Sequence, residues 1–250
     1  MAEVRRTGGV QSIARAFSLL ELVAANGGVM GLSQLAQTSE LPLPTIHRLV
    51  RTLVDLGYLR QEPSRQYALG PRLLIFAEST STMLNSVAIP HLHRLVDELG
   101  ESANLAMLDG DQIVYVAQVP GRHSMRMFTE VGARVLPHCT AVGKALLADW
   151  DLADVRALLS RTGMPRHTEN TIVDADEFVV ALERTREHGY STDDGEQEVG
   201  VHCVGVAVPG AGVPLAISVS GPATRMTDEL VGRAVPILQD GAAALAKDVA

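Results

Sequence analysis

The sequence has only two cysteines, Cys139 and Cys203, in 250 residues. Two cysteines cannot form the disulfide framework of a small secreted domain, so a reducing compartment fits the chain. No apolar run approaches the ~18–20 residues that a membrane-spanning helix needs. The first residues include two arginines but no apolar segment behind them, which argues against a secretory signal. We therefore expect a cytoplasmic protein with no membrane partner.

The sequence also lacks the motifs of common enzymes and metal sites. It has no phosphate loop, no nucleophile elbow, and no C-x-x-C or H-x-x-x-H spacing. The pairs His138-Cys139 and His202-Cys203 carry side chains that bind zinc elsewhere. Because neighbouring residues of a strand point to opposite faces, each pair would supply only one ligand. We expect no metal site and no cofactor.

Negative charge dominates the chain as a whole but not its N-terminal third. The formal net charge is −8. Residues 1–76 contain eight arginines, no lysine and five acidic residues, a net charge of +3, whereas the remainder carries −11. A mildly basic module on an acidic body suits local contact with phosphates.

The first helix is predicted from apolar residues at three- and four-residue steps. Its expected N-cap is Ser12, and Asn26-Gly27-Gly28 ends it with residues that tolerate positive φ. The face expected to be buried consists of Ile13, Ala16, Phe17, Leu20 and Val23.

The elements that follow are typical of a winged helix-turn-helix. A short helix is expected over Ser33–Ser39, with Ser33 as its cap. A proline-rich turn leads into a third helix, which has Pro44 in its first turn and ends at Gly57. Two short strands then flank a turn over residues 62–65.

The polar face of the third helix is the candidate surface for reading DNA. A helix fits the major groove, and its first turns reach the base edges, where Arg pairs with guanine and Thr contacts thymine. An ordinary solvated helix face is the alternative, but the order of the neighbouring elements favours DNA. The first helix, the second helix and the hairpin tip each add one residue to those of the third helix. The candidate DNA-binding residues are Arg15, Ser33, Pro44, Thr45, His47, Arg48, Arg51 and Arg65.

The rest of the chain predicts an α+β domain. Residues 72–100 are expected to be helical with a break near Pro90. Strands and helices then alternate, and strands in antiparallel pairs with inserted helices indicate that class. The predicted strands are 104–108, 113–119, 125–129, 201–208 and 214–220, and the predicted helices are 140–148, 152–160, 177–188 and 228–247.

Eight segments, in order along the chain, resemble the IclR family of transcriptional regulators. They are VQSIARAFSLLELV, GLSQLAQ, LPLPTIHRLVRTLVDLGYL, RQYALGPRLL, HCTAVGKALLA, HGYSTDDGE, GVHCVGVAV and LAISVSGP. The resemblance implies a winged helix-turn-helix DNA-binding domain over residues 9–71, a linker helix over 72–89 and a GAF-like (profilin-like) effector-binding domain over 90–250. It also implies a repressor that binds a double-stranded DNA operator as a homodimer or homotetramer and responds to a small carboxylate-type metabolite.

The resemblance places the effector at the start of the helix over residues 140–148. The first amides of a helix lack intrahelical partners and carry partial positive charge, which suits a carboxylate. Val142 is bulkier than the residue usual in the family, so the identity of the effector does not carry over. The implied effector-binding residues are Met127, Thr140, Ala141, Val142, Asp193, Cys203, Ser218 and Ser220.

Two other classes of function stay open at this point. Cys203 or Cys139 with a histidine could form a thiol nucleophile pair, which would make the C-terminal domain a thiol-dependent enzyme with an accessory DNA-binding module. A purely structural DNA-binding protein is the other class. The missing catalytic motifs argue against the enzyme, and the acidic body with its candidate ligand site argues against the structural protein. We therefore expect no catalytic residue.

Overall fold

A computed structural model describes residues 10–127 and 129–249, with the backbone alone for residues 77–85. The chain divides into two units, Met1–Ser81 and Thr82–Ala250, which are described in turn. The outer domain limits expected at residues 9 and 250 lie outside the described residues. Within the described ranges, no helix combines the length and the apolar character that crossing a membrane requires.

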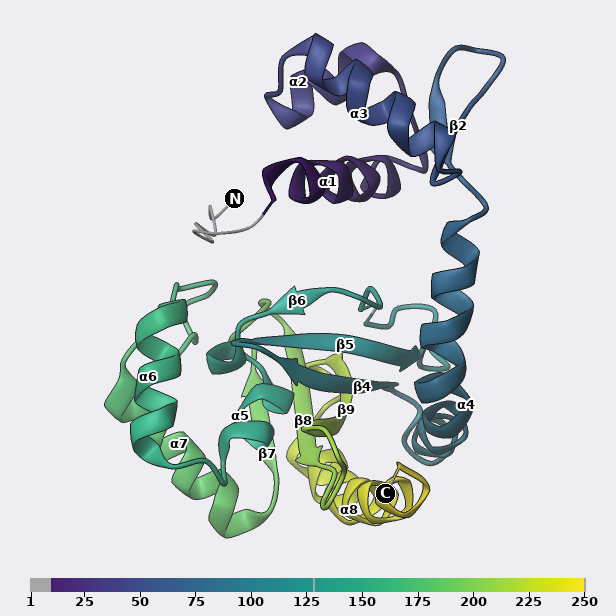
Figure 1. The fold of residues 1–250 in the computed structure, drawn as a ribbon. Helices are drawn as coiled ribbons and strands as arrows, with labels where there is room; N and C mark the ends of the chain where they lie inside the picture. Colours follow the sequence, from purple (N-terminus) through teal and green to yellow (C-terminus); the bar gives the residue numbers. More distant parts are fainter. Residues whose placement is uncertain (1–9, 128, 250) are drawn as a thin grey trace. The chain divides into compact units, whose positions relative to one another are not determined.

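The N-terminal unit packs three helices against a small antiparallel sheet (Figure 1). Its strands are ordered β1-β3-β2. Leu19, Leu35 and Ile46, one from each helix, are fully buried in a shared cluster. The predicted order of helix, helix, turn, helix and hairpin is confirmed. The elements are α1 (Gln11–Ala25), β1 (Val29–Met30), α2 (Leu32–Ser39), α3 (Leu43–Asp55), β2 (Leu59–Gln61) and β3 (Tyr67–Leu69).

Both predicted serine caps in this unit are wrong. The N-cap of α1 is Val10, and Ser12 lies inside the first turn. The N-cap of α2 is Gly31, whose amide donates to Oε1 of Gln34 at 2.9 Å, so Ser33 also lies inside its helix. The side-chain hydrogen bond at this end of the helix is therefore the one that Gln34 accepts from the Gly31 amide.

One side of α1 is apolar and exposed. Ile13 and Phe17, predicted to be buried, are 56% and 61% exposed, and Val10 is 62% exposed. These residues recur at the spacing of a single helix face. Leu19 and Val23 form the buried face instead. Because α1 is apolar on two sides, helical spacing alone could not show which side meets the core.

The two units share α4 (Leu73–Leu99), a continuous helix in which the predicted break near Pro90 does not occur. Proline removes one backbone donor and crowds the preceding turn of a helix. Ala88, Leu92 and Leu95 are nevertheless buried in the core of the C-terminal unit. Because tertiary packing supplies most of a helix's stability, it offsets the hydrogen bond that Pro90 lacks.

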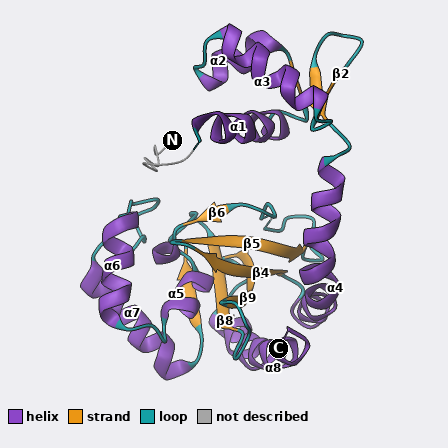
Figure 2. Cartoon of the chain, in the orientation of Figure 1, coloured by secondary structure: helices purple, strands orange, loops and turns teal. Residues whose placement is uncertain are grey.

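A six-stranded antiparallel sheet organises the C-terminal unit (Figure 2). Its order is β6-β5-β4-β9-β8-β7. The strands are β4 (Ser102–Asp109), β5 (Gln112–Val119), β6 (Arg134–Val135), β7 (Ser191–Asp194), β8 (Val201–Ala207) and β9 (Leu215–Pro222). The helices are η1 (Pro137–Cys139), α5 (Ala141–Leu147), α6 (Leu152–Thr162), α7 (Ala175–His188) and α8 (Asp228–Val249).

The two faces of this sheet carry different helices. The C-terminal half of α4 and α8 pack on one face, where Val204 and Ile217 are fully buried. On the other face, α5 together with α6 and α7 packs over Ala106 and Ala216. Each strand of the centre is therefore covered on both sides.

The strand predicted over residues 125–129 is wrong. Residues 125–127 and 129 form no strand, and residue 128 lies outside the described residues. The edge strand beside β5 is β6, which pairs Val135 with Ile113 and is too short to produce an alternating pattern. The sequence pattern does not predict β7 either, because Ser191–Asp194 is polar throughout.

Candidate functional site

The third helix of the N-terminal unit, α3, has one buried and one exposed side. Its buried residues are Ile46, Val50 and Leu53. Of the predicted DNA contacts on this helix, Thr45 is half-buried and the others are exposed: Pro44, His47, Arg48 and Arg51. The exposed side therefore offers guanidinium and imidazole groups to a partner.

The other predicted DNA contacts lie on separate elements of the same unit. Ser33 is exposed in the first turn of α2. Arg65 is exposed at the tip between β2 and β3, where its φ is 64°. Arg15 is half-buried and lines a hollow of about 400 Å³ between α1 and α2. Arg65 is therefore better placed to reach a partner than Arg15.

In the C-terminal unit, strand register brings the predicted effector residues together. Asp193 of β7 lies opposite Cys203 of β8, and Cys203 lies opposite Ser220 of β9. Ser218, two residues before Ser220, shares its face of the strand. Directly opposite residues of antiparallel strands point to the same face. The four side chains therefore form one group, here called the polar row.

The start of α5 lies against the polar row. A Cβ atom on Gly205 of β8 would lie 3.0 Å from the carbonyl carbon of Ala141 and 3.1 Å from the amide nitrogen of Val142. The absence of a side chain at Gly205 therefore permits this close approach. Ser191 donates from Oγ to the Ala141 carbonyl at 2.6 Å. Because Gly205 lies opposite Ser218, the first amides of α5 come close to the serines.

Thr140 caps α5 with its side chain. Its Oγ1 accepts from the Gly143 amide at 3.1 Å. A Cβ atom on Gly143 would lie 2.2 Å from the Pro137 carbonyl oxygen, so the tight turn from η1 into α5 requires glycine. Among the described residues, none accepts from the amides of Ala141 and Val142. These buried amides are therefore able to donate to a ligand oxygen.

Asn104 of β4 organises the serines, and sequence reasoning missed it. Its Nδ2 donates to Oγ of Ser220 at 3.2 Å and to Oγ of Ser218 at 3.4 Å, while Gln118 donates to its Oδ1 at 3.0 Å. Because each serine accepts from the amide, each keeps its O–H for another acceptor. The available signal was a single amide inside the otherwise apolar run of residues 104–108.

Met127 reaches the end of the polar row through its backbone. Ser102, which lies opposite Ser220, donates from Oγ to the Met127 carbonyl at 2.7 Å. The Met127 residue itself is half-buried. The structure thus gathers predicted effector residues from a loop, a helix and three strands.

Burial raises the pKa values of three groups in this site. It raises the pKa of Asp193 to about 6, although a 2.7 Å hydrogen bond from the Glu196 amide acts in the opposite direction. Burial also raises the pKa of the Cys203 thiol above its usual range. Tyr115 of β5, which sequence reasoning also missed, has its pKa raised by burial and by the nearby Cys203 and Asp193. Asp193 is therefore more easily protonated than an exposed aspartate.

A buried ion pair lies behind the start of α5. Lys144 pairs with Oε1 of Glu196 and also donates from Nζ to the Thr192 carbonyl at 2.7 Å. Burial raises the pKa of Glu196 even though Lys144 opposes that change. Oε2 of Glu196 has no hydrogen-bond partner among the residues that the structure describes.

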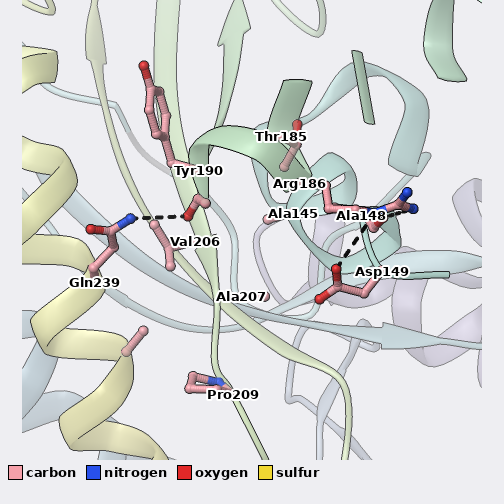
Figure 3. A pocket seen from close by; sticks show the side chains of 12 residues that line it. Ala145, Ala148, Asp149, Thr185, Arg186, Tyr190, Val206, Ala207, Pro209 and Gln239 are labelled. Atoms are coloured by element: carbon pink, nitrogen blue, oxygen red, sulfur yellow. Dashed lines mark hydrogen bonds and ion pairs between the residues drawn. The ribbon is translucent and has the colours of Figure 1, made fainter. Parts of the chain in front are cut away.

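A separate cavity of about 310 Å³ lies among α5, α7, β8 and α8 (Figure 3). Two of its polar groups already have protein partners. Arg186 donates to the Ala148 carbonyl at 2.8 Å, and Gln239 donates to the Gly189 carbonyl at 3.5 Å. No effector residue predicted from the sequence lines this cavity. The polar row and the start of α5 therefore remain the better candidate site.

Two family models match this chain. The model described as Bacterial transcriptional regulator IclR C-terminal matches residues 77–247, and the model described as IclR helix-turn-helix domain matches residues 12–63. The chain belongs to the IclR family of transcriptional regulators. Family membership makes the protein a DNA-binding regulator and not an enzyme, so the thiol-dependent alternative has no support.

The similarity to other IclR-family proteins covers nearly the whole of this chain. The transcriptional repressor IclR of Escherichia coli is 36% identical over 242 residues, which cover 92% of this chain and 87% of the repressor. The structure of an IclR transcriptional regulator from Alicyclobacillus acidocaldarius is 29% identical, with a TM-score of 0.83 and coverage of 97% of this chain and 100% of that one. An IclR homolog from Microbacterium hydrocarbonoxydans, complexed with 4-hydroxybenzoate, is 25% identical, with a TM-score of 0.83 and coverage of 96% and 99%.

These findings confirm the family and the α+β fold class predicted from the sequence. They also confirm the winged helix-turn-helix, the C-terminal effector domain and the prediction of a regulator.

Proposed function

We propose that this IclR-family protein is a repressor that reads operator DNA with α3 and changes its affinity for DNA when a small organic acid binds beside the polar row. The observation that carries this proposal is the two-sided character of α3. Ile46 and Val50 anchor the helix in the core, whereas Arg48 and Arg51 face outward.

The DNA contacts are assigned by position on the helix-turn-helix. Thr45 and Arg48 lie three residues apart near the start of α3 and therefore share the side that reaches base edges. Arg51 lies three residues after Arg48, further from the start of α3, and is assigned to phosphate contact. Arg65 at the hairpin tip reaches the backbone or the minor groove. The net charge of −11 outside residues 1–76 keeps DNA contact local to the N-terminal unit.

The decisive experiment replaces Arg48 by alanine. One paired contact between arginine and guanine contributes about 1–3 kcal/mol, so Arg48→Ala should lower operator affinity roughly 5- to 150-fold. Fluorescence anisotropy at one fixed salt concentration measures this, with DNA from upstream of the regulator's own gene. Arg94→Ala is the matched control, because Arg94 is an exposed arginine of the C-terminal unit paired with Glu98. Equal affinity of the Arg48 variant and the wild type would refute the assignment.

The effector is assigned as a small organic acid. Its carboxylate would accept from the amides of Ala141 and Val142 and from the hydroxyls of Ser218 and Ser220. Asp193 would bond a hydroxyl group of the same ligand. The Microbacterium relative supports this class, because 4-hydroxybenzoate carries both a carboxylate and a hydroxyl.

A thermal-shift screen of small carboxylic acids tests the effector assignment. An acid present at about 100 times its dissociation constant should stabilise the protein by roughly 2.7 kcal/mol. Ser220→Ala should weaken that effect, whereas Ser160→Ala, at an exposed serine of α6, should not. A panel without any stabilising acid would contradict the proposal, as would an acid that stabilises the Ser220 variant fully.

The working form is proposed to be a homodimer or a pair of dimers. The exposed apolar stripe of α1, made by Val10, Ile13 and Phe17, supports self-association, because such patches mark interaction sites. A two-fold dimer would present two copies of α3 to half-sites one helical turn apart.

We assign DNA binding to residues 9–71, linkage to 72–89 and effector binding to 90–250. The effector must bind DNA-competent and DNA-incompetent arrangements with different affinity in order to switch them.

A further inference from the structure

Three side chains that bind metals elsewhere meet just before α5, outside the contacts proposed for DNA and effector. His138 and Cys139 belong to η1, and His167 belongs to the connection between α6 and α7. One ligand atom from each lies within 4.8 Å of the others. The sequence pairs His138 with Cys139 but gives no sign of His167, because His167 is remote along the chain.

The hydrogen bond made by His138 determines which ring nitrogen is available. Its Nε2 lies 3.1 Å from the Pro165 carbonyl oxygen. Because a carbonyl only accepts, Nε2 carries the proton and Nδ1 of the neutral ring carries a lone pair. His138 is 0% exposed, and Nδ1 has no partner among the described residues. Metal-binding histidines typically donate their other ring N–H to a backbone carbonyl or carboxylate in this way.

The thiol of Cys139 is buried and already lies beside a polar partner. Its Sγ donates to Oε1 of Gln197 at 2.8 Å. A divalent cation at Sγ would replace the thiol proton, because a coordinating thiol is deprotonated outright.

We propose that Nδ1 of His138, Sγ of Cys139 and a ring nitrogen of His167 bind Zn²⁺. Two imidazoles and one thiolate match the nitrogen and sulfur ligands that zinc takes, whereas Mg²⁺ and Ca²⁺ take oxygen. Ligand atoms of a tetrahedral zinc site lie roughly 3.3–3.6 Å apart, as bond lengths of about 2.0–2.3 Å require. The three ligand atoms lie within 4.8 Å of one another, so they would have to approach by about 1 Å, and the exposed ring of His167 has room to move. Binding releases the thiol proton of Cys139 to solvent and leaves one coordination position open.

The metal would join two walls of the proposed effector site. Cys139 immediately precedes the cap of α5. The loop that carries His167 is tied to the segment after β7, because Thr171 donates from Oγ1 to the Glu196 carbonyl at 2.7 Å. A Zn²⁺ ion held by η1 and by this loop would therefore order both segments that flank the polar row.

Cobalt titration of the chelator-treated full-length protein tests the site. Co²⁺ reports a thiolate ligand through a charge-transfer absorption band, and Zn²⁺ should displace it. We expect one Co²⁺ per chain with that band. The apparent affinity should rise with pH, because the metal competes with the thiol proton.

Three variants locate the bound metal. Cys139→Ser should abolish the charge-transfer band, and Cys203→Ser, at the other cysteine, should retain it. His167→Gln changes an exposed side chain, so it should leave the fold intact and lower affinity at least about tenfold. Binding below one ion per chain, a band that persists in Cys139→Ser, or full affinity in His167→Gln would overturn the proposal. None of these measurements needs DNA or effector, so they succeed or fail independently of the proposed function.

Discussion

The buried carboxyl of Asp193 gives the candidate effector site a measurable dependence on pH. Burial raises its pKa from 3.8 to about 6. At about 1.4 kcal/mol per pKa unit, this difference corresponds to roughly 3 kcal/mol against keeping the group ionised in the folded state. Between about pH 4 and pH 6 the folded chain binds more protons than the unfolded chain. The free energy of unfolding therefore falls as the pH rises through that window.

Asp193→Asn removes this charge while its Oδ1 can still accept from the Glu196 amide, which lies 2.7 Å away in the wild type. Near pH 7 we expect the free energy of unfolding of the variant to exceed that of the wild type by up to about 3 kcal/mol. Near pH 4 we expect no difference. Urea denaturation followed by circular dichroism at several pH values measures the difference. Asp194→Asn is the matched control, because the neighbouring carboxyl is exposed and pairs only with His202 among the described residues.

The reasoning fails if the Asp193 variant gains the same free energy at both pH values, since the gain would then not come from ionisation. A loss of stability near pH 7 would also refute it. That result would mean that the carboxylate gains more from Lys144 and the Glu196 amide than burial costs.

Other substitutions test the remaining features. Ile46→Ala should destabilise the N-terminal unit by about 2–5 kcal/mol, because Ile46 is fully buried where α3 meets the core; thermal unfolding measures the loss. Phe17→Glu should lower self-association without lowering the stability of the unit, because the Phe17 side chain is exposed. Light scattering across a dilution series measures the association, and unchanged association would contradict the prediction. Cys203 should react slowly with iodoacetamide at neutral pH and rapidly after denaturation, because burial raises its pKa; fast reaction of the native thiol would contradict this.

Most helices and central strands could be predicted because their residues repeat at the period of the element. The apolar steps of α3 and the hairpin of β4 and β5 around Gly110 are examples. Short elements could not be predicted this way: two residues each in β1 and β6 give no period. The continuity of α4 through Pro90 also needed knowledge of its packing, since local propensity favours a break there.

The candidate site shows the same limit. The resemblance to the IclR family supplied Asp193, Cys203 and the serines, and register brings them into one row. Asn104 was missed because its role depends on lying across a strand pair from Ser218. His167 was missed because only the folded connection brings it to Cys139.

Neighbouring residues along β8 and β9 have different roles, because their side chains point to opposite faces of the sheet. Val204 and Ile217 face the helices that hold the domain together, whereas Cys203 and Ser218 face the proposed ligand. A library that varies Cys203, Ser218 and Ser220 would therefore sample new ligand preferences. Gly205 and Ala216 on the same face would be kept, because both pack closely beneath the helices there. This separation makes the domain a suitable starting point for biosensors with altered response.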